Sequence, residues 1–136
     1  MKSVINLKIY YEDTDAAGIV YYANYLKYFE RARTEMFYEL GLSVRELLSK
    51  GIMFVVTDAE VHYYSPAQLG DILEIETQIT EVKRVSVVFC YSVRRVSEQK
   101  VLVDGKTKLA VVNLGRKIVK LPVEVYEKLS SVNLSQ

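Results

Sequence analysis

One long apolar stripe, followed by strands of alternating polarity, most constrains what this chain can fold into. Residues 22–40 are predicted to form a single helix, because apolar side chains recur there at steps of three and four residues. The stripe consists of Tyr25, Phe29, Ala32, Met36 and Leu40. Gly41 follows directly, at the position where helices commonly end in a left-handed residue. A helix with such a stripe must bury it against another layer.

That second layer is predicted to be an antiparallel sheet. In residues 73–80, apolar side chains alternate with polar ones, which is the pattern of a strand with one buried face. Further strands are expected at residues 4–11, 54–64, 85–93 and 101–113. We also expect a short helix capped by Ser43 and a terminal helix that begins after Pro122. One long helix followed by successive antiparallel strands indicates an α+β layout, with the helix covering one sheet face.

The bulk properties limit the class of protein. A chain of 136 residues, half of them hydrophobic, is expected to form one domain over residues 1–136. A net charge of +1 gives no field that would attract nucleic acid. One cysteine, Cys90, excludes an intrachain disulfide, and one histidine, His62, makes a metal site unexpected. The sequence contains neither a secretory signal nor a membrane span, so we expect a cytoplasmic protein.

Two carboxylates lie in a small-residue turn between the first strand and the long helix. Residues 13–22 read DTDAAGIVYY. A carboxylate beside a helix N-terminus suits chemistry on a carbonyl: it can attack the carbonyl carbon or activate water. Free backbone N–H groups at the helix start can then hold the developing oxyanion. Aspartate and glycine are also common in ordinary turns, so the motif by itself leaves a structural role open.

The longer segment 11–37, YEDTDAAGIVYYANYLKYFERARTEMF, resembles the N-terminal block of the 4-hydroxybenzoyl-CoA thioesterase family. It is most similar to the acyl-CoA thioesterase branch that is linked to the Tol–Pal system of bacteria. The resemblance implies the hotdog fold, in which an antiparallel sheet wraps around one long helix. It also implies hydrolysis of an acyl-CoA thioester to a carboxylic acid and CoA, without a cofactor. Family members pair edge to edge with their sites at the interface, so a homodimer or a homotetramer is expected.

The resemblance also assigns roles to individual residues. The functional aspartate of the family is the second of the pair, which places catalysis on Asp15, as nucleophile or general base. Gly18 would bend the backbone so that the N–H groups of Tyr21 and Tyr22 point into the site, with the Tyr22 N–H polarising the thioester oxygen. Relatives often carry histidine where this chain has Tyr22, so the acyl preference stays open. Asp13 is expected to hydrogen-bond the turn backbone.

Two pairs of basic residues match positions that grip the CoA nucleotide in the family. Lys83 and Arg84 lie at a tight connection between strands, and Arg116 and Lys117 follow the last strand. Side chains of this kind form charge-assisted hydrogen bonds with phosphates. Lysine and arginine in turns are most often only solvated, so a plain surface role competes with this assignment.

Glutamates on the predicted helix need a separate interpretation, because another branch of hotdog thioesterases uses a helix glutamate. Glu30 precedes Arg33 by three residues, and Arg31 precedes Glu35 by four. Pairs at this spacing face each other on a helix surface. The spacing therefore favours exposed ion pairs over catalysis.

Other functions remain open at this level. The same carboxylate would serve a thioesterase that acts on acyl carrier protein, and basic residues suit an acidic carrier protein as well as CoA. A protein that only binds acyl thioesters would have no need for Asp15 and Gly18. Dehydratases of the same fold need a histidine base, and His62 lies in the wrong region of the chain. The fold does not choose among these functions, but the site does.

Overall fold

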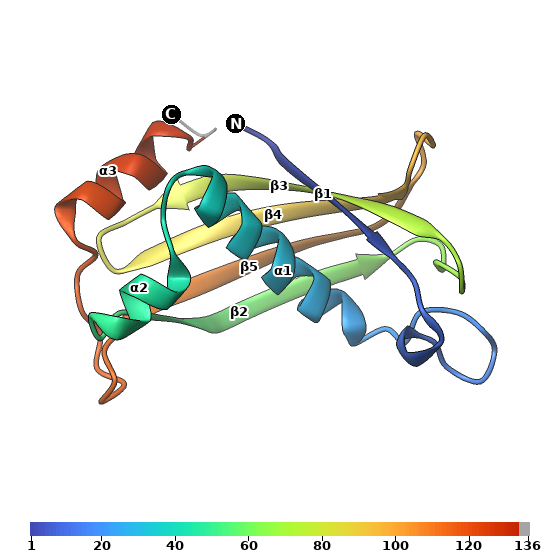
Figure 1. Cartoon of the computed structure of the whole chain (residues 1–136), viewed down its shortest axis with the longest axis horizontal. Helices are drawn as coiled ribbons and strands as arrows, with labels where there is room; N and C mark the ends of the chain where they lie inside the picture. The colour runs from blue at the N-terminus through green and yellow to red at the C-terminus, as the bar shows by residue number, and fades with distance from the viewer. Residues whose placement is uncertain (134–136) are drawn as a thin grey trace.

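The computed structural model describes residues 1–133, and residues 134–136 lie outside this range. Its elements follow the predicted order (Figure 1). They are β1 (Ser3–Lys8), the 3₁₀ turn η1 (Tyr11–Asp13), α1 (Asn24–Glu39), α2 (Val44–Ser49), β2 (Met53–Tyr63), β3 (Ile72–Val82), β4 (Ser86–Arg95), β5 (Val101–Val112) and α3 (Val123–Ser131). None of the helices within residues 1–133 is long and apolar enough to cross a membrane.

The five strands form one antiparallel sheet with the order β1-β3-β4-β5-β2. Helix α1 lies across one face of this sheet, and α2 and α3 lie at the end of the sheet where α1 finishes (Figure 1). Irregularities in register at Val56/Asp58 and Ile79/Glu81 add local twist to β2 and β3. A sheet that wraps around one long helix is the hotdog arrangement, as the resemblance implied.

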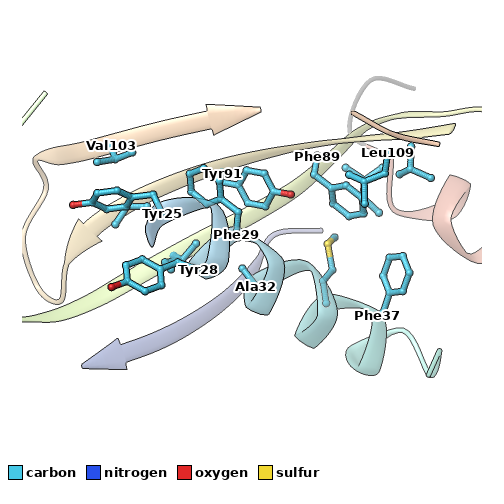
Figure 2. Packing of buried hydrophobic residues seen from close by; sticks show 14 of the residues in the cluster. Tyr25, Tyr28, Phe29, Ala32, Phe37, Phe89, Tyr91, Val103 and Leu109 are labelled. Carbon is cyan, nitrogen blue, oxygen red and sulfur yellow. The ribbon is translucent and has the colours of Figure 1, made fainter. Parts of the chain in front are cut away.

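The predicted stripe of α1 forms the centre of the core (Figure 2). Four of its five members are buried and Leu40 is half-buried. The ring of Phe29 stacks on Tyr91 of β4 with a centroid distance of 4.2 Å and an interplanar angle of 7°. Gly105 of β5 makes room for this ring, because a Cβ there would lie 2.7 Å from Phe29 Cζ. This contact fixes α1 against the sheet and thereby holds its N-terminus in place.

Beside the motif, two element boundaries differ from the sequence prediction. The first strand ends at Lys8, earlier than expected, because the chain curls into η1. Helix α1 begins at Asn24 and not at residue 22, because the preceding backbone is held by contacts outside the helix. The predicted caps are confirmed: Ser43 Oγ accepts a hydrogen bond from Glu46 N at 3.2 Å, and α3 starts after Pro122.

The ion pairs predicted on α1 do not form within residues 1–133. Arg33 Nη1 instead donates to the hydroxyl of Tyr91 at 3.3 Å, and that hydroxyl lies 2.6 Å from Thr107 Oγ1. The guanidinium of Arg31 lies over the ring of Tyr28, 5.9 Å from its centroid. The arginine side chains therefore satisfy a buried hydroxyl and an aromatic face, which the helical spacing alone did not indicate.

Candidate active site

The motif between η1 and α1 folds into a small turn that its own backbone closes. Asp15 N donates to Ile19 O at 2.9 Å, and Gly18 N donates to Asp15 O at 3.0 Å. Gly18 has φ of +77°, in the left-handed region that glycine occupies without strain. The predicted bend at Gly18 is confirmed. The segment between η1 and α1 lies at the end of the molecule opposite α3 (Figure 1), and Asp15 within it is exposed.

The turn also fixes the direction of the Asp15 side chain. Its Oδ1 accepts a hydrogen bond from Ala17 N at 2.8 Å, which is an Asx turn. Within residues 1–133 this carboxylate accepts no other hydrogen bond, and the residue is exposed. The structural role of a turn aspartate therefore leaves its second oxygen open to water or a substrate.

Asp13 is the anchor of the turn, as predicted. Its Oδ2 accepts a hydrogen bond from Tyr10 N at 2.8 Å. Its main-chain oxygen accepts two more, from Tyr21 N at 3.0 Å and from Asn24 Nδ2 at 2.8 Å. Because the Tyr21 N–H is used in this way, the prediction that it points into the site is wrong.

The Tyr22 N–H has a different environment. It donates to no backbone or side-chain acceptor within residues 1–133. The carbonyls on both sides are fixed: Tyr21 O accepts from Asn24 N at 2.9 Å, and Tyr22 O accepts from Tyr63 Oη at 2.9 Å. Helix α1 begins two residues later without a side-chain cap, so the free N–H lies at the positive end of its dipole. Such a group can hold an oxyanion.

Tyr22 also lines an apolar cavity of about 310 Å³. Its volume lies at the small end of the range for small-molecule pockets. Tyr63 packs against the rings of Tyr22 and Tyr25, with centroid distances of 6.3 and 5.7 Å. The cavity is lined by Ile19, Val20, Tyr22, Tyr25, Tyr63, Tyr64, Ser65 and Pro66. Apolar and aromatic walls of this kind suit an acyl group.

Three phenols in or near the cavity, those of Tyr25, Tyr28 and Tyr63, stay neutral at pH 7. Burial raises the pKa of Tyr25 above its ordinary value. Burial, followed by the nearby Asp13 carboxylate, raises the pKa of Tyr28. Burial, followed by Tyr22, raises the pKa of Tyr63. None of these three tyrosines can therefore act as a base at neutral pH.

Arg84 is engaged at the far end of the sheet. Its Nη2 donates to Leu121 O at 2.8 Å, and its guanidinium lies over the ring of Tyr126 at 5.4 Å from the centroid. Leu121 N in turn donates to Arg84 O at 2.7 Å. These contacts tie the turn between β3 and β4 to the segment that leads into α3. The role of Arg84 in CoA binding stays a prediction.

The other predicted cations are exposed at the same end of the molecule. Lys83 is 3.9 Å from the carboxylate of Glu81, and Arg116 and Lys117 lie in the turn that follows β5. This end carries α3, whereas the Asp15 turn lies at the opposite end of α1 (Figure 1). The structure therefore brings Asp15, Gly18 and Tyr22 together, but within one chain it does not bring the cations to them.

Comparison with known proteins places the chain in a family. Residues 10–129 match the profile of the thioesterase-like superfamily. The chain belongs to that superfamily. It is 40% identical over 121 residues to the acyl-CoA thioesterase YbgC of Haemophilus influenzae, a match that covers 88% of each protein. These findings confirm the resemblance that the motif indicated.

Two further matches agree with this family and with the fold. The chain is 48% identical over 83 residues to the acyl-CoA thioester hydrolase YbgC of Escherichia coli O6:H1. That match spans 61% of this chain and 62% of the relative's length. Among solved structures, the DHNA-CoA thioesterase of Staphylococcus aureus matches with a TM-score of 0.92 at 25% identity, over 96% of this chain and 90% of that one.

Sequence reasoning about this thioesterase-like chain missed the contribution of β2 to the site. Tyr63 ends that strand, Tyr64 follows it, and both line the cavity, although 41 residues separate Tyr63 from its hydrogen-bond partner Tyr22. The sequence carried one signal for this, since Tyr63, Tyr64 and the following Ser65-Pro66 mark a strand end rich in aromatic rings. Only the pairing of β2 with β5 shows that this end lies beside the start of α1.

Proposed function

We propose that this chain hydrolyses an acyl-CoA thioester to a carboxylic acid and free CoA. The observation that carries the proposal is the geometry of one short loop. A carboxylate with an open oxygen, Asp15, precedes an unpaired backbone N–H, that of Tyr22, beside an apolar cavity. The names of the two YbgC relatives, acyl-CoA thioesterase and acyl-CoA thioester hydrolase, support the same reaction.

The reaction uses these groups in two ways that share one oxyanion site. As a general base, the Asp15 carboxylate takes a proton from water while the water oxygen attacks the thioester carbon. As a nucleophile, the carboxylate attacks that carbon itself, and water then hydrolyses the mixed anhydride. In both cases the C–S bond breaks and CoA leaves as the thiolate. The Tyr22 N–H stabilises the negative oxygen, an interaction that contributes about 3 kcal/mol in enzymes of this kind.

The proposed assembly is a homodimer in which two copies of β2 pair, with a homotetramer as a pair of such dimers. Strand β2 is 11 residues long and lies at the edge of the sheet. Its start, Met53, pairs with Val112 at the end of β5, and its end, Tyr63, lies at the cavity. Antiparallel pairing of two copies would set the start of one β2 beside the end of the other.

This pairing would supply the cations that a single chain lacks at its site. Arg116 and Lys117 lie in the turn after β5, whose last residue pairs with the start of β2. In the dimer they would lie beside the partner's Asp15 turn, where they would bind the phosphates of CoA. Lys83, on the turn between β3 and β4 at the same end, would extend this basic surface.

Thiol release from a panel of CoA thioesters tests the proposal. The panel contains short aliphatic, long aliphatic and aromatic acyl groups, together with one thioester of acyl carrier protein. We expect steady release of CoA from at least one CoA ester, and the panel then ranks the acyl groups. Hydrolysis of the carrier-protein ester alone, or of no ester, would contradict the proposal.

A further inference from the structure

We propose that Asp71, held by Arg95, is a positioning residue for Asp15. Its carboxylate ends a chain of hydrogen-bonded peptide groups that runs through the segment between β2 and β3 to the backbone N–H of Asp15. The inference rests on the proposed thioesterase function and deepens it, because it assigns the placement of the proposed nucleophile or base to a distant ion pair.

The ion pair lies where β4 ends and β3 begins. Arg95 Nε donates to Asp71 Oδ2 at 2.9 Å, and Arg95 Nη2 donates to the carbonyl of Pro66 at 3.0 Å. Only 26% of the Arg95 side chain and 20% of the Asp71 side chain are exposed, so water and salt screen this pair less than a surface pair. One planar guanidinium therefore binds both ends of the segment 66–71.

The Asp71 carboxylate orients the first peptide group of the chain. Its Oδ2 accepts a second hydrogen bond, from Gln68 N at 2.8 Å. The Gln68 N–H and the Ala67 carbonyl belong to one peptide plane. That carbonyl accepts a hydrogen bond from Val20 N at 2.9 Å. Asp71 therefore holds one edge of the peptide plane whose other edge binds the motif.

The next peptide group extends the chain to Asp15. The Val20 N–H and the Ile19 carbonyl share one plane, and this carbonyl accepts from Asp15 N at 2.9 Å. Two planar peptide groups therefore connect the carboxylate of Asp71 with the backbone of Asp15. Hydrogen bonds in such a chain strengthen one another, because each polarises the next.

A second hydrogen bond to the motif depends on the same aspartate. Leu69 N donates to Gly18 O at 3.0 Å. The Gln68 carbonyl, in the same peptide plane as the Leu69 N–H, accepts from Asp71 N at 3.0 Å. Both of these contacts with the motif therefore come from peptide groups that Asp71 holds, one through its side chain and one through its backbone.

Loss of the Asp71 carboxylate would let the Asp15 turn shift, which should weaken catalysis more than substrate binding. A displacement of about 1 Å in a reacting group can cost up to about a hundredfold in rate. The nucleotide of CoA would still bind at the basic surface, so KM should stay close to its original value. The fall in kcat should be the same for every acyl group, because the same Asp15 carboxylate acts on all of them.

The test is Asp71→Ala beside Asp71→Asn, with acetyl-CoA, hexanoyl-CoA and benzoyl-CoA as substrates. In Asp71→Ala we expect kcat to fall about tenfold, by the same factor for each ester that the wild type hydrolyses, with KM within about threefold of the wild-type value. Asparagine keeps an oxygen that can accept from Gln68 N, whereas alanine leaves this N–H unpaired. Asp71→Asn should therefore keep kcat within about threefold of the wild type.

Glu98→Gln is the matched control for charge. Glu98 is an exposed carboxylate 3.8 Å from the same guanidinium, and within residues 1–133 its side chain forms no hydrogen bond with the segment 66–71. Its variant should match the wild type in kcat and KM. Arg95→Lys covers the case in which Asp71→Ala does not fold. Lysine keeps the charge but has no planar fork for two acceptors, so kcat should fall by about threefold.

Amide hydrogen exchange, measured by NMR, tests the chain of peptide groups without any substrate. In Asp71→Ala we expect the N–H groups of Asp15 and Val20 to exchange at least about tenfold faster than in the wild type. The Glu46 N–H, which binds the cap of α2 far from the motif, should keep its rate. Faster exchange at all three groups would indicate general destabilisation and would count against a positioning role.

Three results would overturn the inference: a wild-type kcat in Asp71→Ala, a fall in kcat that differs among the acyl groups, or unchanged exchange at Asp15. If Asp71→Ala does not fold, a wild-type kcat in Arg95→Lys overturns it instead. These outcomes can be told apart from failure of the proposed function. If the wild type releases no thiol from any ester, the proposed function is wrong and the inference falls with it.

Discussion

At the scale of single residues, the structural role of the loop is compatible with the proposed chemistry. The Asx turn that stabilises the backbone at Asp15 uses one carboxylate oxygen and leaves the other open. Asp13, two positions earlier, uses both its side chain and its main chain to anchor the loop. The two aspartates of the motif therefore do different work, as the sequence predicted. The proposed chemistry belongs to Asp15, which is exposed, whereas Asp13 is half-buried.

Gly18 provides a prediction at this scale. An alanine Cβ there would meet no atom within 4 Å, so the cost of Gly18→Ala is backbone strain alone, about 1–2 kcal/mol for a left-handed residue. Part of this strain should be relieved by movement of the loop, and kcat should fall with stability. Urea denaturation and steady-state kinetics measure the two effects.

Gly51→Ala is the matched control, because Gly51 has φ of +79° and equally open surroundings but lies between α2 and β2, outside the loop. It should lose about the same stability and keep its kcat. An active Gly18→Ala variant with wild-type kcat would show that the bend is not needed for catalysis.

The residues of the motif were predictable because they are contiguous. Asp15, Gly18 and Tyr22 lie within one short segment that resembles a known family block. Tyr63 was not predictable in this way, because its place beside Tyr22 depends on where β2 ends in the folded sheet. The free N–H of Tyr22, in contrast to the paired N–H of Tyr21, depends on which of two adjacent peptide groups faces Asp13 O. A sequence pattern does not resolve that choice.

At the scale of elements, the sequence predicted the helix and strand order because the periods are regular. The alternation in β3 and the stripe of α1 both place apolar side chains in buried positions. The misplaced features were boundaries and side-chain partners: the late start of α1 and the partners of Arg31 and Arg33. Both depend on tertiary contacts, which override local spacing.

Arg84 yields a prediction about the connection between β3, β4 and α3. Arg84→Ala would remove the hydrogen bond to Leu121 O and the contact with the Tyr126 ring. We expect a loss of about 1–2 kcal/mol in the free energy of unfolding. Lys83→Ala, next to it and exposed, should leave stability unchanged. Equal stability of the two variants in urea denaturation would show that the Arg84 contacts do not support the fold.

Gly105 tests how closely α1 packs on the sheet. Gly105→Ala would bring a methyl group against the Phe29 ring that stacks on Tyr91. Overpacking of this kind costs about 1–3 kcal/mol. Thermal and urea denaturation should both show the loss. A variant as stable as the wild type would mean that the ring has room to move.

At the scale of the whole molecule, the proposal is that one chain holds only part of the site. The Asp15 loop and the basic surface lie at opposite ends of α1 (Figure 1), and the proposed pairing of two β2 edges would bring them together. The cytoplasmic location and the single-domain organisation stay predictions from the sequence. The oligomer could not be derived from the sequence because it depends on which sheet edge stays open.

Subunit complementation tests this arrangement. Lys83→Ala combined with Lys117→Ala should raise KM for a CoA ester more than for a truncated thioester without the nucleotide. Co-assembly of this variant with Asp15→Asn would then rebuild one complete site per heterodimer, from Asp15 of one chain and Lys117 of the other. Activity at low substrate concentration should return. If a verified heterodimer stays inactive at low substrate concentration, the shared site is contradicted. Full activity of a protein that light scattering shows to be a monomer would contradict it as well.

The most direct test of the central claim is the kcat of Asp15→Asn on the best CoA ester, measured beside Glu12→Gln. Glu12 is an exposed carboxylate of the adjacent 3₁₀ turn, so its variant removes the same charge without touching the site. Asp15→Asn should lower kcat by at least about a hundredfold while the CoA ester still binds, and Glu12→Gln should match the wild type. A kcat for Asp15→Asn within about twofold of the wild type would remove Asp15 from the mechanism.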